Sequence, residues 1–376
     1  MEQVFSGARI VAGGALIEGA LIVRNGRVHA IEPGASQVGE DMDGDVLAPG
    51  IIDLHTDNLE KHYFPRPNID WDPVSATIVH DGLCASVGIT TVYDSLSVGS
   101  FANLARTEDN QLRLVDGVAH AAREGLLKID HRLHWRCELS APDLAERIDR
   151  YVNMPLTGLL SLMDHTPGQR QYKNIDRFIK AWRAEGMSDA DVDERIAVAR
   201  ERQARHVEPN RKLIAELARV AKIPLAAHDD ETEAHVDDAA VAGATISEFP
   251  VTMEAAARAR AHGMAVIMGG PNLIRGGSYS GNVPAADVAV AGLLDGFASD
   301  YVPRSLIECA LRLTQAPFGW DLPRAWATVS RAPAQALGLT DRGTLEPSLR
   351  ADFVRVRIVD GRPLVRAVHV EGRRVV

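Results

Sequence analysis

Eight short apolar runs recur between residues 50 and 340, and stretches with helical periodicity separate them. A regular alternation of strands and helices is typical of a parallel sheet, and a closed (β/α)8 barrel requires eight strands. We therefore expect an α/β chain whose main unit, residues 50–340, is a TIM-like (β/α)8 barrel. The runs that predict its strands cover residues 51–55, 89–93, 132–138, 158–164, 224–228, 244–248, 265–269 and 296–300.

The two ends of the chain resemble each other and differ from the middle. Residues 8–32 alternate apolar and polar side chains around Asn25-Gly26, and residues 353–376 do the same around Asp360-Gly361 and Glu371-Gly372. Such dipeptides favour the tight turns of β-hairpins. We predict that residues 1–49 and 341–376 meet in one small β-rich module. The length of 376 residues suits such a module beside a barrel of ~250 residues.

The longest insertion, about residues 166–222, follows the fourth run and predicts two or three helices beside the active face. Ser188 and Asp191 have the spacing of an N-terminal capping box, although Asp replaces the usual Glu or Gln. Pro209 predicts the end of one helix and the start of the next, because proline disrupts a helix interior but suits a first turn.

The first apolar run carries metal-ligand side chains where it ends. His55 and Asp57 follow Ile51-Ile52, and residues two apart on a strand face the same way. An imidazole and a carboxylate that point together can both bind a divalent metal. Taken alone, a His-x-Asp pair can equally be a hydrogen-bonded structural pair.

Four further runs end in residues of the same kinds. These residues are Glu138, His165, His228 and Asp300. A barrel enzyme builds its active site at the carboxyl ends of its strands. One such ending can be a solvated strand end, but five endings with two types of metal ligand predict a metal-dependent active site.

With these residues, the chain resembles the amidohydrolase superfamily of metal-dependent hydrolases. The resemblance implies one or two divalent ions, Zn²⁺ first, with Mn²⁺ or Fe²⁺ as alternatives. It implies that Glu138 is a bridging ligand and that Asp300 acts as the general base. The implied metal-binding residues are His55, Asp57, Glu138, His165, His228 and Asp300.

Two features depart from the superfamily pattern. Asp57 replaces the usual second histidine, which leaves open whether it is a ligand or supports one. The middle ligands also fall on the third to fifth strands counted here, one strand earlier than is commonly described. A miscounted strand is the expected reason.

Within the superfamily, the motifs at residues 55–62, 163–170 and 268–278 resemble the PhnM family of phosphonate-degradation enzymes. The resemblance implies hydrolysis of α-D-ribose 1-methylphosphonate 5-triphosphate to the 5-phosphate and pyrophosphate in the C–P lyase pathway. Metal-activated water would attack the α-phosphorus. The substrate contacts implied by these motifs are Lys61, His62, Arg170, Asn272, Arg275 and Ser278.

Cationic side chains in the loops suit such a substrate. A triphosphate carries about four negative charges, and its hydrolysis depends mainly on positioning and charge neutralisation. Lys61, Arg170, Lys173 and Arg275 follow strand candidates, and Arg275 precedes a Gly/Ser-rich loop whose backbone amides can cradle an anion. An enzyme that opens a cyclic amide or imide would share the fold and metals, and it stays the alternative. A barrel without activity that serves as a scaffold is a third reading.

Composition limits the partners and the cellular compartment that we expect for this protein. A net charge of −10 argues against nucleic-acid binding, and no segment approaches membrane-spanning length. The three cysteines are far apart, which excludes a disulfide framework and predicts a cytoplasmic protein. The expected partners are a small phosphorylated substrate and other enzymes of phosphonate degradation, with a homodimer left open.

Overall fold

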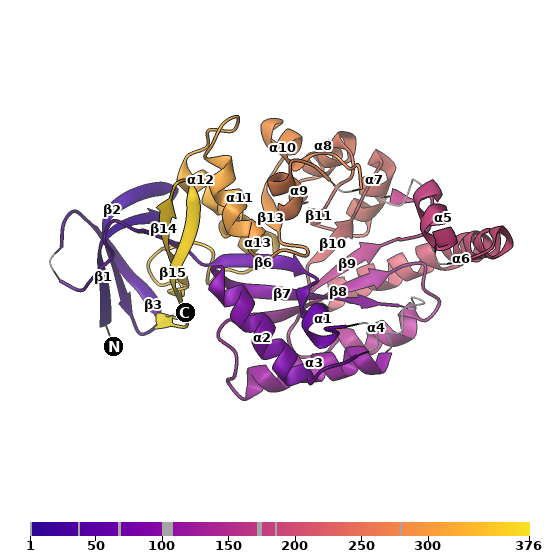
Figure 1. The fold of residues 1–376 in the computed structure, drawn as a ribbon, viewed down its shortest axis with the longest axis horizontal. Coiled ribbons are helices and arrows are strands. Elements are labelled where there is room, and N and C mark those ends of the chain that lie inside the picture. The colour runs from indigo at the N-terminus through magenta and orange to yellow at the C-terminus, as the bar shows by residue number, and fades with distance from the viewer. Residues whose placement is uncertain are drawn as a thin grey trace.

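The computed structural model describes residues 2–36, 38–66, 69–99, 108–170, 175–184, 186–278 and 280–376. Within these ranges the chain forms two sheets of eight strands each. Figure 1 shows the parallel sheet with its helices on one side of the molecule and the second sheet, with both termini, on the other. None of the helices in these ranges combines the length and the apolarity that a membrane span needs.

The parallel sheet confirms the predicted barrel. Its eight strands follow one another in chain order, each paired with the next, and every strand overlaps one of the predicted runs. They are β6 (Ile51–Thr56), β7 (Ile89–Val98), β8 (Asp130–Glu138), β9 (Thr157–Met163), β10 (Leu225–His228), β11 (Ile246–Glu248), β12 (Ala265–Gly269) and β13 (Gly296–Ala298).

Backbone contacts bring the first and last strands together. The Asp300 amide donates to the His55 carbonyl at 3.0 Å, and the Asp57 amide donates to the Asp300 carbonyl at 2.7 Å. Deeper in the barrel, the Ser299 amide donates to the Asp53 carboxylate at 3.0 Å. The barrel is therefore nearly closed, and its seam lies beside three of the predicted metal-binding residues.

Apolar side chains fill the barrel and separate it from the helices. Leu133, Trp135 and Cys137 of β8 lie in the outer layer, so strand alternation turns His134, Arg136 and Glu138 inward. The other strands fill the interior with Ile52, Leu54, Tyr93, Leu159, Ala226, Ile246, Ile267 and Ala298. The helices of the barrel are α1 (Asn58–Tyr63), α2 (Pro73–Ser86), α3 (Glu108–Arg123), α4 (Leu144–Val152), α7 (Glu233–Val241), α8 (Met253–Ala261), α9 (Gly270–Arg275), α10 (Ala285–Val290), α11 (Ser305–Leu313), α12 (Leu322–Ala327) and α13 (Arg331–Ala336).

The second sheet joins both ends of the chain, as the sequence predicts. Its order is β16-β15-β14-β5-β1-β2-β3, and β4 pairs with β1. Asn25 and Gly26 both have positive φ, of 53° and 77°, which is what the tightest hairpin turn requires. The strands are β1 (Glu2–Ala12), β2 (Ala15–Arg24), β3 (Arg27–Pro33), β4 (Glu40–Asp41), β5 (Val46–Pro49), β14 (Phe353–Val359), β15 (Arg362–Val370) and β16 (Arg373–Arg374).

Gly50 is the junction between the two sheets. It separates β5 from β6, and a Cβ at this position would lie 2.1 Å from the Thr90 hydroxyl oxygen, so a larger residue would force β6 and β7 apart. Beside it, the buried Trp326 indole donates to the Pro49 carbonyl at 2.9 Å. The two sheets are thus packed together at this point. The predicted domain boundaries after residues 49 and 340 stay a prediction.

The insertion after β9 forms two helices, α5 (Ile175–Ala184) and α6 (Asp189–Ala221). The predicted capping box at Ser188 and Asp191 is confirmed, with both reciprocal contacts present. The predicted helix end at Pro209 is wrong, because α6 continues through it. Proline removes one helical hydrogen bond, but the next residue anchors the helix: the buried Asn210 amide donates to the carbonyls of Leu139 and Ala141.

Candidate active site

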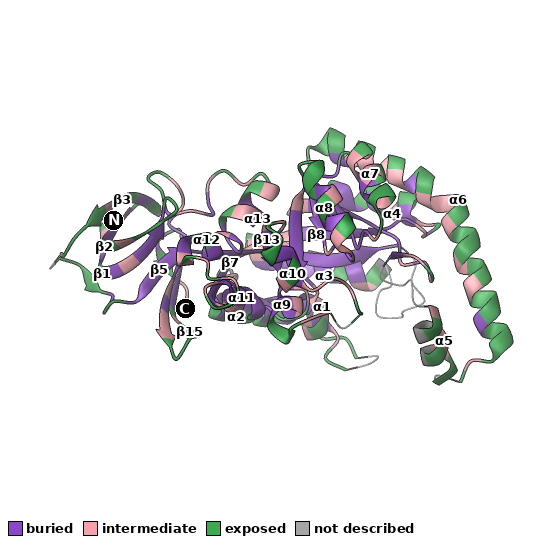
Figure 2. Ribbon diagram, turned by 90° about the horizontal axis from the view of Figure 1, so that it is seen from above, coloured by how far each residue is buried: buried purple, intermediate pink, exposed green. Residues whose placement is uncertain are grey.

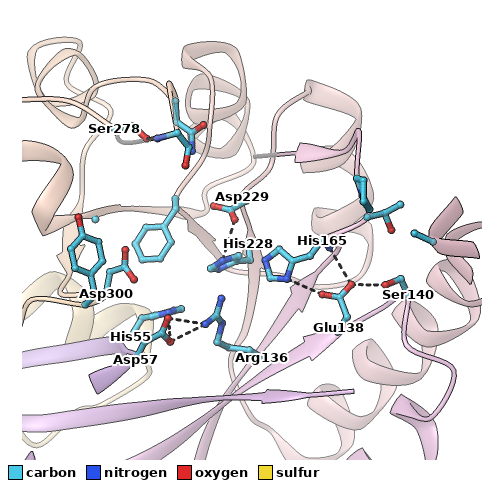
Figure 3. Close-up of a pocket in the computed structure, with 18 of the residues that line it drawn as sticks. His55, Asp57, Arg136, Glu138, Ser140, His165, His228, Asp229, Ser278 and Asp300 are labelled. Atoms are coloured by element: carbon cyan, nitrogen blue, oxygen red, sulfur yellow. Dashed lines mark hydrogen bonds and ion pairs between the residues drawn. The ribbon is translucent and has the colours of Figure 1, made fainter. Parts of the chain in front are cut away.

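The carboxyl ends of the barrel strands open into a cavity of about 1020 Å³. Figure 3 shows the side chains that lie on its floor, which come from both halves of the barrel. Six predicted metal-binding residues lie here, each at or just beyond a strand end: His55, Asp57, Glu138, His165, His228 and Asp300.

One group of possible metal-ligand atoms comes from the barrel seam. Atoms of His55, Asp57 and Asp300 all lie within 4.8 Å of one another. His55 Nε2 is 3.5 Å from Asp57 Oδ1, so these two side chains do meet. Asp57 occupies the N-cap position of α1 with φ −93° and ψ 13°, so simple strand alternation does not extend to it. The turn into the helix brings its carboxylate back beside His55.

A second group lies at the ends of the middle strands. Atoms of His165, His228 and Asp229 also lie within 4.8 Å of one another. His228 Nε2 is 3.3 Å from Asp229 Oδ2, a buried oxygen that accepts no hydrogen bond from the described residues. Asp229 has φ 57°, a conformation that non-glycine residues adopt at a cost of order 1–3 kcal/mol. The surrounding structure therefore keeps the Asp229 backbone in an unfavourable conformation, and that conformation places the carboxylate beside His228.

Two glutamates orient the imidazoles of these groups. Glu248, at the end of β11, binds His55 Nδ1 at 2.8 Å and His228 Nδ1 at 2.6 Å. Glu138 Oε2 lies 2.9 Å from His165 Nδ1, and Glu138 Oε1 accepts from the Ser140 hydroxyl at 2.7 Å. A histidine that donates from Nδ1 to a carboxylate keeps the Nε2 lone pair for a metal. The hydrogen bonds to Glu248 therefore leave Nε2 as the metal-binding atom of His55 and His228.

Carboxylates dominate the charge of the cavity floor. Arg136 offsets one of them, since its Nη1 lies 2.8 Å and 3.0 Å from the two oxygens of Asp57. The five carboxylates are Asp57, Glu138, Asp229, Glu248 and Asp300. Clustered acids with one guanidinium between them are costly unless cations neutralise them. The donor set of imidazoles and carboxylates fits divalent metal ions.

The same crowding shifts protonation equilibria. Burial and the neighbouring Asp57 carboxylate raise the pKa of Asp300 to about 6. Burial disfavours a charged imidazole, but Glu248 and Asp57 outweigh it and raise the pKa of His55 to about 10. A metal ion and a proton compete for the same nitrogen, so metal binding would release this proton.

The predicted substrate contacts fall into two sets. Asn272, Arg275 and Ser278 line the cavity, and the last two precede or lie in the glycine-rich loop that follows α9. Arg275 Nη1 donates to the Tyr301 hydroxyl at 3.2 Å. The other three predicted contacts, Lys61, His62 and Arg170, lie outside the cavity lining. Lys173 lies outside the described residues.

Each of these three side chains contacts other groups of the protein. Lys61 Nζ donates to the Tyr301 carbonyl at 3.2 Å. His62 lies beside His80, with ring centroids 5.9 Å apart, over a buried His80–Asp94–His131 network between α2 and the barrel. Arg170 is buried and pairs with Asp230, and it also donates to the His228 carbonyl at 2.6 Å.

Sequence reasoning did not assign Arg136, Asp229 and Glu248. Arg136 stands two residues before Glu138 on the same strand, which places it on the same face, and Glu248 ends a predicted strand like the five residues that were noticed. The explanation by a miscounted strand is wrong, because the eight strands are those predicted. Glu138, His165 and His228 do belong to the third, fourth and fifth barrel strands, and the sixth ends in Glu248.

Comparisons with known proteins identify relatives along the full chain. The α-D-ribose 1-methylphosphonate 5-triphosphate diphosphatase of Escherichia coli (strain K12) is 40% identical over 381 residues, which cover 99% of this chain and 100% of that protein. No family model matches the chain.

Solved structures share the fold at low identity. The 5-methylcytosine deaminase of Klebsiella pneumoniae aligns with a TM-score of 0.66 and 16% identity over 100% of this chain and 97% of that one. The N-acetyl-D-glucosamine-6-phosphate deacetylase of Mycobacterium smegmatis aligns with a TM-score of 0.62 and 17% identity, over 100% and 99%. At this identity the likeness shows the fold alone, a (β/α)8 barrel with a separate β-rich sheet.

Proposed function

The chain belongs to the family of α-D-ribose 1-methylphosphonate 5-triphosphate diphosphatases, and on that premise we propose that it releases pyrophosphate from this triphosphate. The second product is α-D-ribose 1-methylphosphonate 5-phosphate. The observation that carries the proposal is the full-length relationship, together with a strand-end site that combines metal-ligand side chains and cations in one cavity. The neighbours that act on nitrogen bases or amides share only the fold, so hydrolysis of a cyclic amide or imide is not favoured.

We assign the metal-binding atoms to the two groups on the cavity floor. His55, Asp57 and Asp300 would hold one ion, and His165, His228 and Asp229 the other. Glu138 as a bridging ligand stays a prediction, since its carboxylate here binds His165 and Ser140. Nitrogen and carboxylate donors suit Zn²⁺, and Mn²⁺ or Fe²⁺ is compatible with the same set. When bound, such an ion supplies Lewis acidity that makes water a stronger nucleophile near neutral pH and offsets phosphate charge.

Asp300 is proposed as the general base. Without a metal its pKa is raised to about 6, and a bound cation would lower it, so its carboxylate is ionised at neutral pH and can accept a proton from water. Water attack on the α-phosphorus requires that proton to leave, and pyrophosphate then departs from the same phosphorus. The carboxylic acid formed at Asp300 can return the proton to a leaving oxygen.

Arg275 and the loop beside it are proposed to hold the pyrophosphate portion. Arg275 brings a guanidinium to the cavity, and the Gly276–Gly277 pair with positive φ opens the backbone next to Ser278. A guanidinium and exposed backbone amides are suited to phosphate oxygens. Arg170 is instead proposed to stabilise the site through the backbone of His228, and Lys61 to act through the backbone of Tyr301.

The experiment that tests this function supplies two substrates to the purified, metal-loaded protein. With α-D-ribose 1-methylphosphonate 5-triphosphate we expect one pyrophosphate and one 5-phosphate per turnover, and with a dihydropyrimidine we expect no ring opening. A His228→Asn variant prepared in parallel controls for contaminating phosphatase. Release of orthophosphate in place of pyrophosphate would refute attack at the α-phosphorus, and ring opening would support the alternative.

A further inference from the structure

The cavity has two walls of different chemistry above the shared floor. One is formed by α9 and the loop after it, with Asn272 and Arg275 on the helix and Ser278 in the loop. The opposite wall is formed by α5 and α6, which project beyond the barrel, as Figure 2 shows from above. This second wall carries apolar and basic side chains together: Trp182, Met187, Arg195, Val198, Ala199 and Arg202.

A single stripe of α6 faces the cavity. Residues three or four apart on a helix lie on the same side, and Arg195, Val198 and Arg202 keep this spacing over two turns. Asp191 and Glu194 continue the stripe toward the start of the helix. Asp191 is bound by Ser188 in the helix cap, so its carboxylate already has donors.

The two arginines of the stripe can accept an anionic ligand. Arg195 stacks on the Trp182 ring at 4.7 Å, and its remaining described contact is a weak one to the Met187 sulfur at 3.6 Å. Arg202 also lines the cavity, and it forms no ion pair with any of the described residues. Stacking on an aromatic face fixes the guanidinium plane without using its hydrogen-bond donors.

The substrate of the proposed function has two anionic ends. The triphosphate is polar throughout, whereas the methylphosphonate combines negative oxygens with one methyl group. The wall at α9 is mainly polar, with the Arg275 guanidinium, the Asn272 amide and the Ser278 hydroxyl beside exposed backbone, which suits the pyrophosphate. The α6 wall adds apolar surface to its arginines, which suits an anion with a methyl group.

We propose that the α5–α6 wall is the binding site for the methylphosphonate end of the substrate. This inference rests on the proposed function. Arg195 and Arg202 donate hydrogen bonds to the phosphonate oxygens, and Trp182, Met187 and Val198 contact the methyl group. The substrate then lies across the metal-binding floor with its α-phosphorus between the two walls, so α6 selects the substrate and the barrel performs the hydrolysis.

The test compares ligands that differ only in the methylphosphonate. Arg195→Ala and Arg202→Ala are titrated by calorimetry with α-D-ribose 1-methylphosphonate 5-phosphate and with ribose 5-phosphate. Arg200→Ala is the matched control, because Arg200 lies on the same helix, is exposed and is not part of the cavity lining. Loss of a charge-assisted hydrogen bond should weaken binding of the methylphosphonate ligand about tenfold or more in each cavity variant. Binding of ribose 5-phosphate should be unchanged.

Pyrophosphate release by the wild-type protein separates this inference from the proposed function. Suppose that the wild type releases pyrophosphate, but that both variants bind the two ligands with equally reduced affinity or with unchanged affinity. The methylphosphonate assignment is then overturned and the proposed function stands. If the wild type releases none while the variants still lose affinity for the methylphosphonate ligand alone, the function fails and the binding site stands.

Discussion

Glu248 offers the sharpest test of how the site is organised. It is fully buried and binds the Nδ1 atoms of His55 at 2.8 Å and His228 at 2.6 Å, so one carboxylate fixes both rings. Glutamine has the same shape but one acceptor and one donor. In Glu248→Gln, one of the two rings must face an amide N–H and accept from it at Nδ1. That ring then carries its proton on Nε2, and the nitrogen that faces the cavity can no longer bind a metal.

The expected loss follows from the two hydrogen bonds. Each joins a histidine to a charged acceptor, and such a bond contributes about 1.5–3 kcal/mol. Losing one should raise the metal dissociation constant roughly tenfold to a hundredfold, the range also typical of residues that orient metal-binding histidines. Because glutamine conserves volume, the variant should fold like the wild type.

The measurement is a competition titration of metal-stripped protein with Zn²⁺ and a chromophoric chelator, with circular dichroism to confirm folding. Glu254→Gln is the control, since it makes the same change at an exposed position of α8. A folded Glu248→Gln protein with wild-type zinc affinity would refute the argument. It would mean that the two rings do not depend on this carboxylate for their orientation.

Three other variants test the proposed general base Asp300, the buried Arg170 and the proposed phosphate contact Arg275. Asp300→Asn should lower kcat at least about a hundredfold, because an amide cannot accept the proton of the attacking water. The folded pKa of Asp300 lies above the unfolded value of about 3.9, so its charge opposes folding above pH 6 and not below pH 4. The metal-free Asn variant should therefore melt above wild type at pH 7 and equally with it at pH 4. Arg170→Ala should cost about 3–5 kcal/mol of stability, seen in denaturant titrations, because it leaves the buried Asp230 without its cation. Arg275→Ala should keep full metal content and lose about tenfold in kcat/KM; unchanged kinetics would remove it from the substrate site.

The barrel and most of its floor were predictable from the sequence because their signals are local. A strand that ends in a ligand-type residue is visible in the chain, as at His55 and His228, and the parallel arrangement gathers all such ends at one edge. The terminal sheet was predictable for a related reason, since hairpin dipeptides such as Asn25-Gly26 define their turns locally.

What escaped prediction depends on partners far apart in the sequence. Arg170 follows a strand like a substrate contact, yet it pairs with Asp230, 60 residues away, and does not line the cavity. Pro209 looks like a helix end, but Asn210 fastens α6 to carbonyls of the loop after β8. Helix propensity and residue spacing are local signals, and they do not show where a contact between distant residues determines the structure instead.

Asp57 departs from the superfamily pattern, and its ion pair with Arg136 explains why the two residues occur together. Asp57 stands where the superfamily usually has a second histidine, and Arg136, buried on β8, binds its carboxylate. A histidine at position 57 would remove the carboxylate that pairs directly with the buried guanidinium, and breaking such a pair costs about 3 kcal/mol or more. Asp57→His should therefore lower both stability and metal content, although it restores the common His-x-His motif. The double variant with Arg136→Gln should recover stability, since the buried charge is gone. If the single variant melts like the wild type and binds as much metal, the two residues are independent, and Asp57 is a ligand that any histidine could replace.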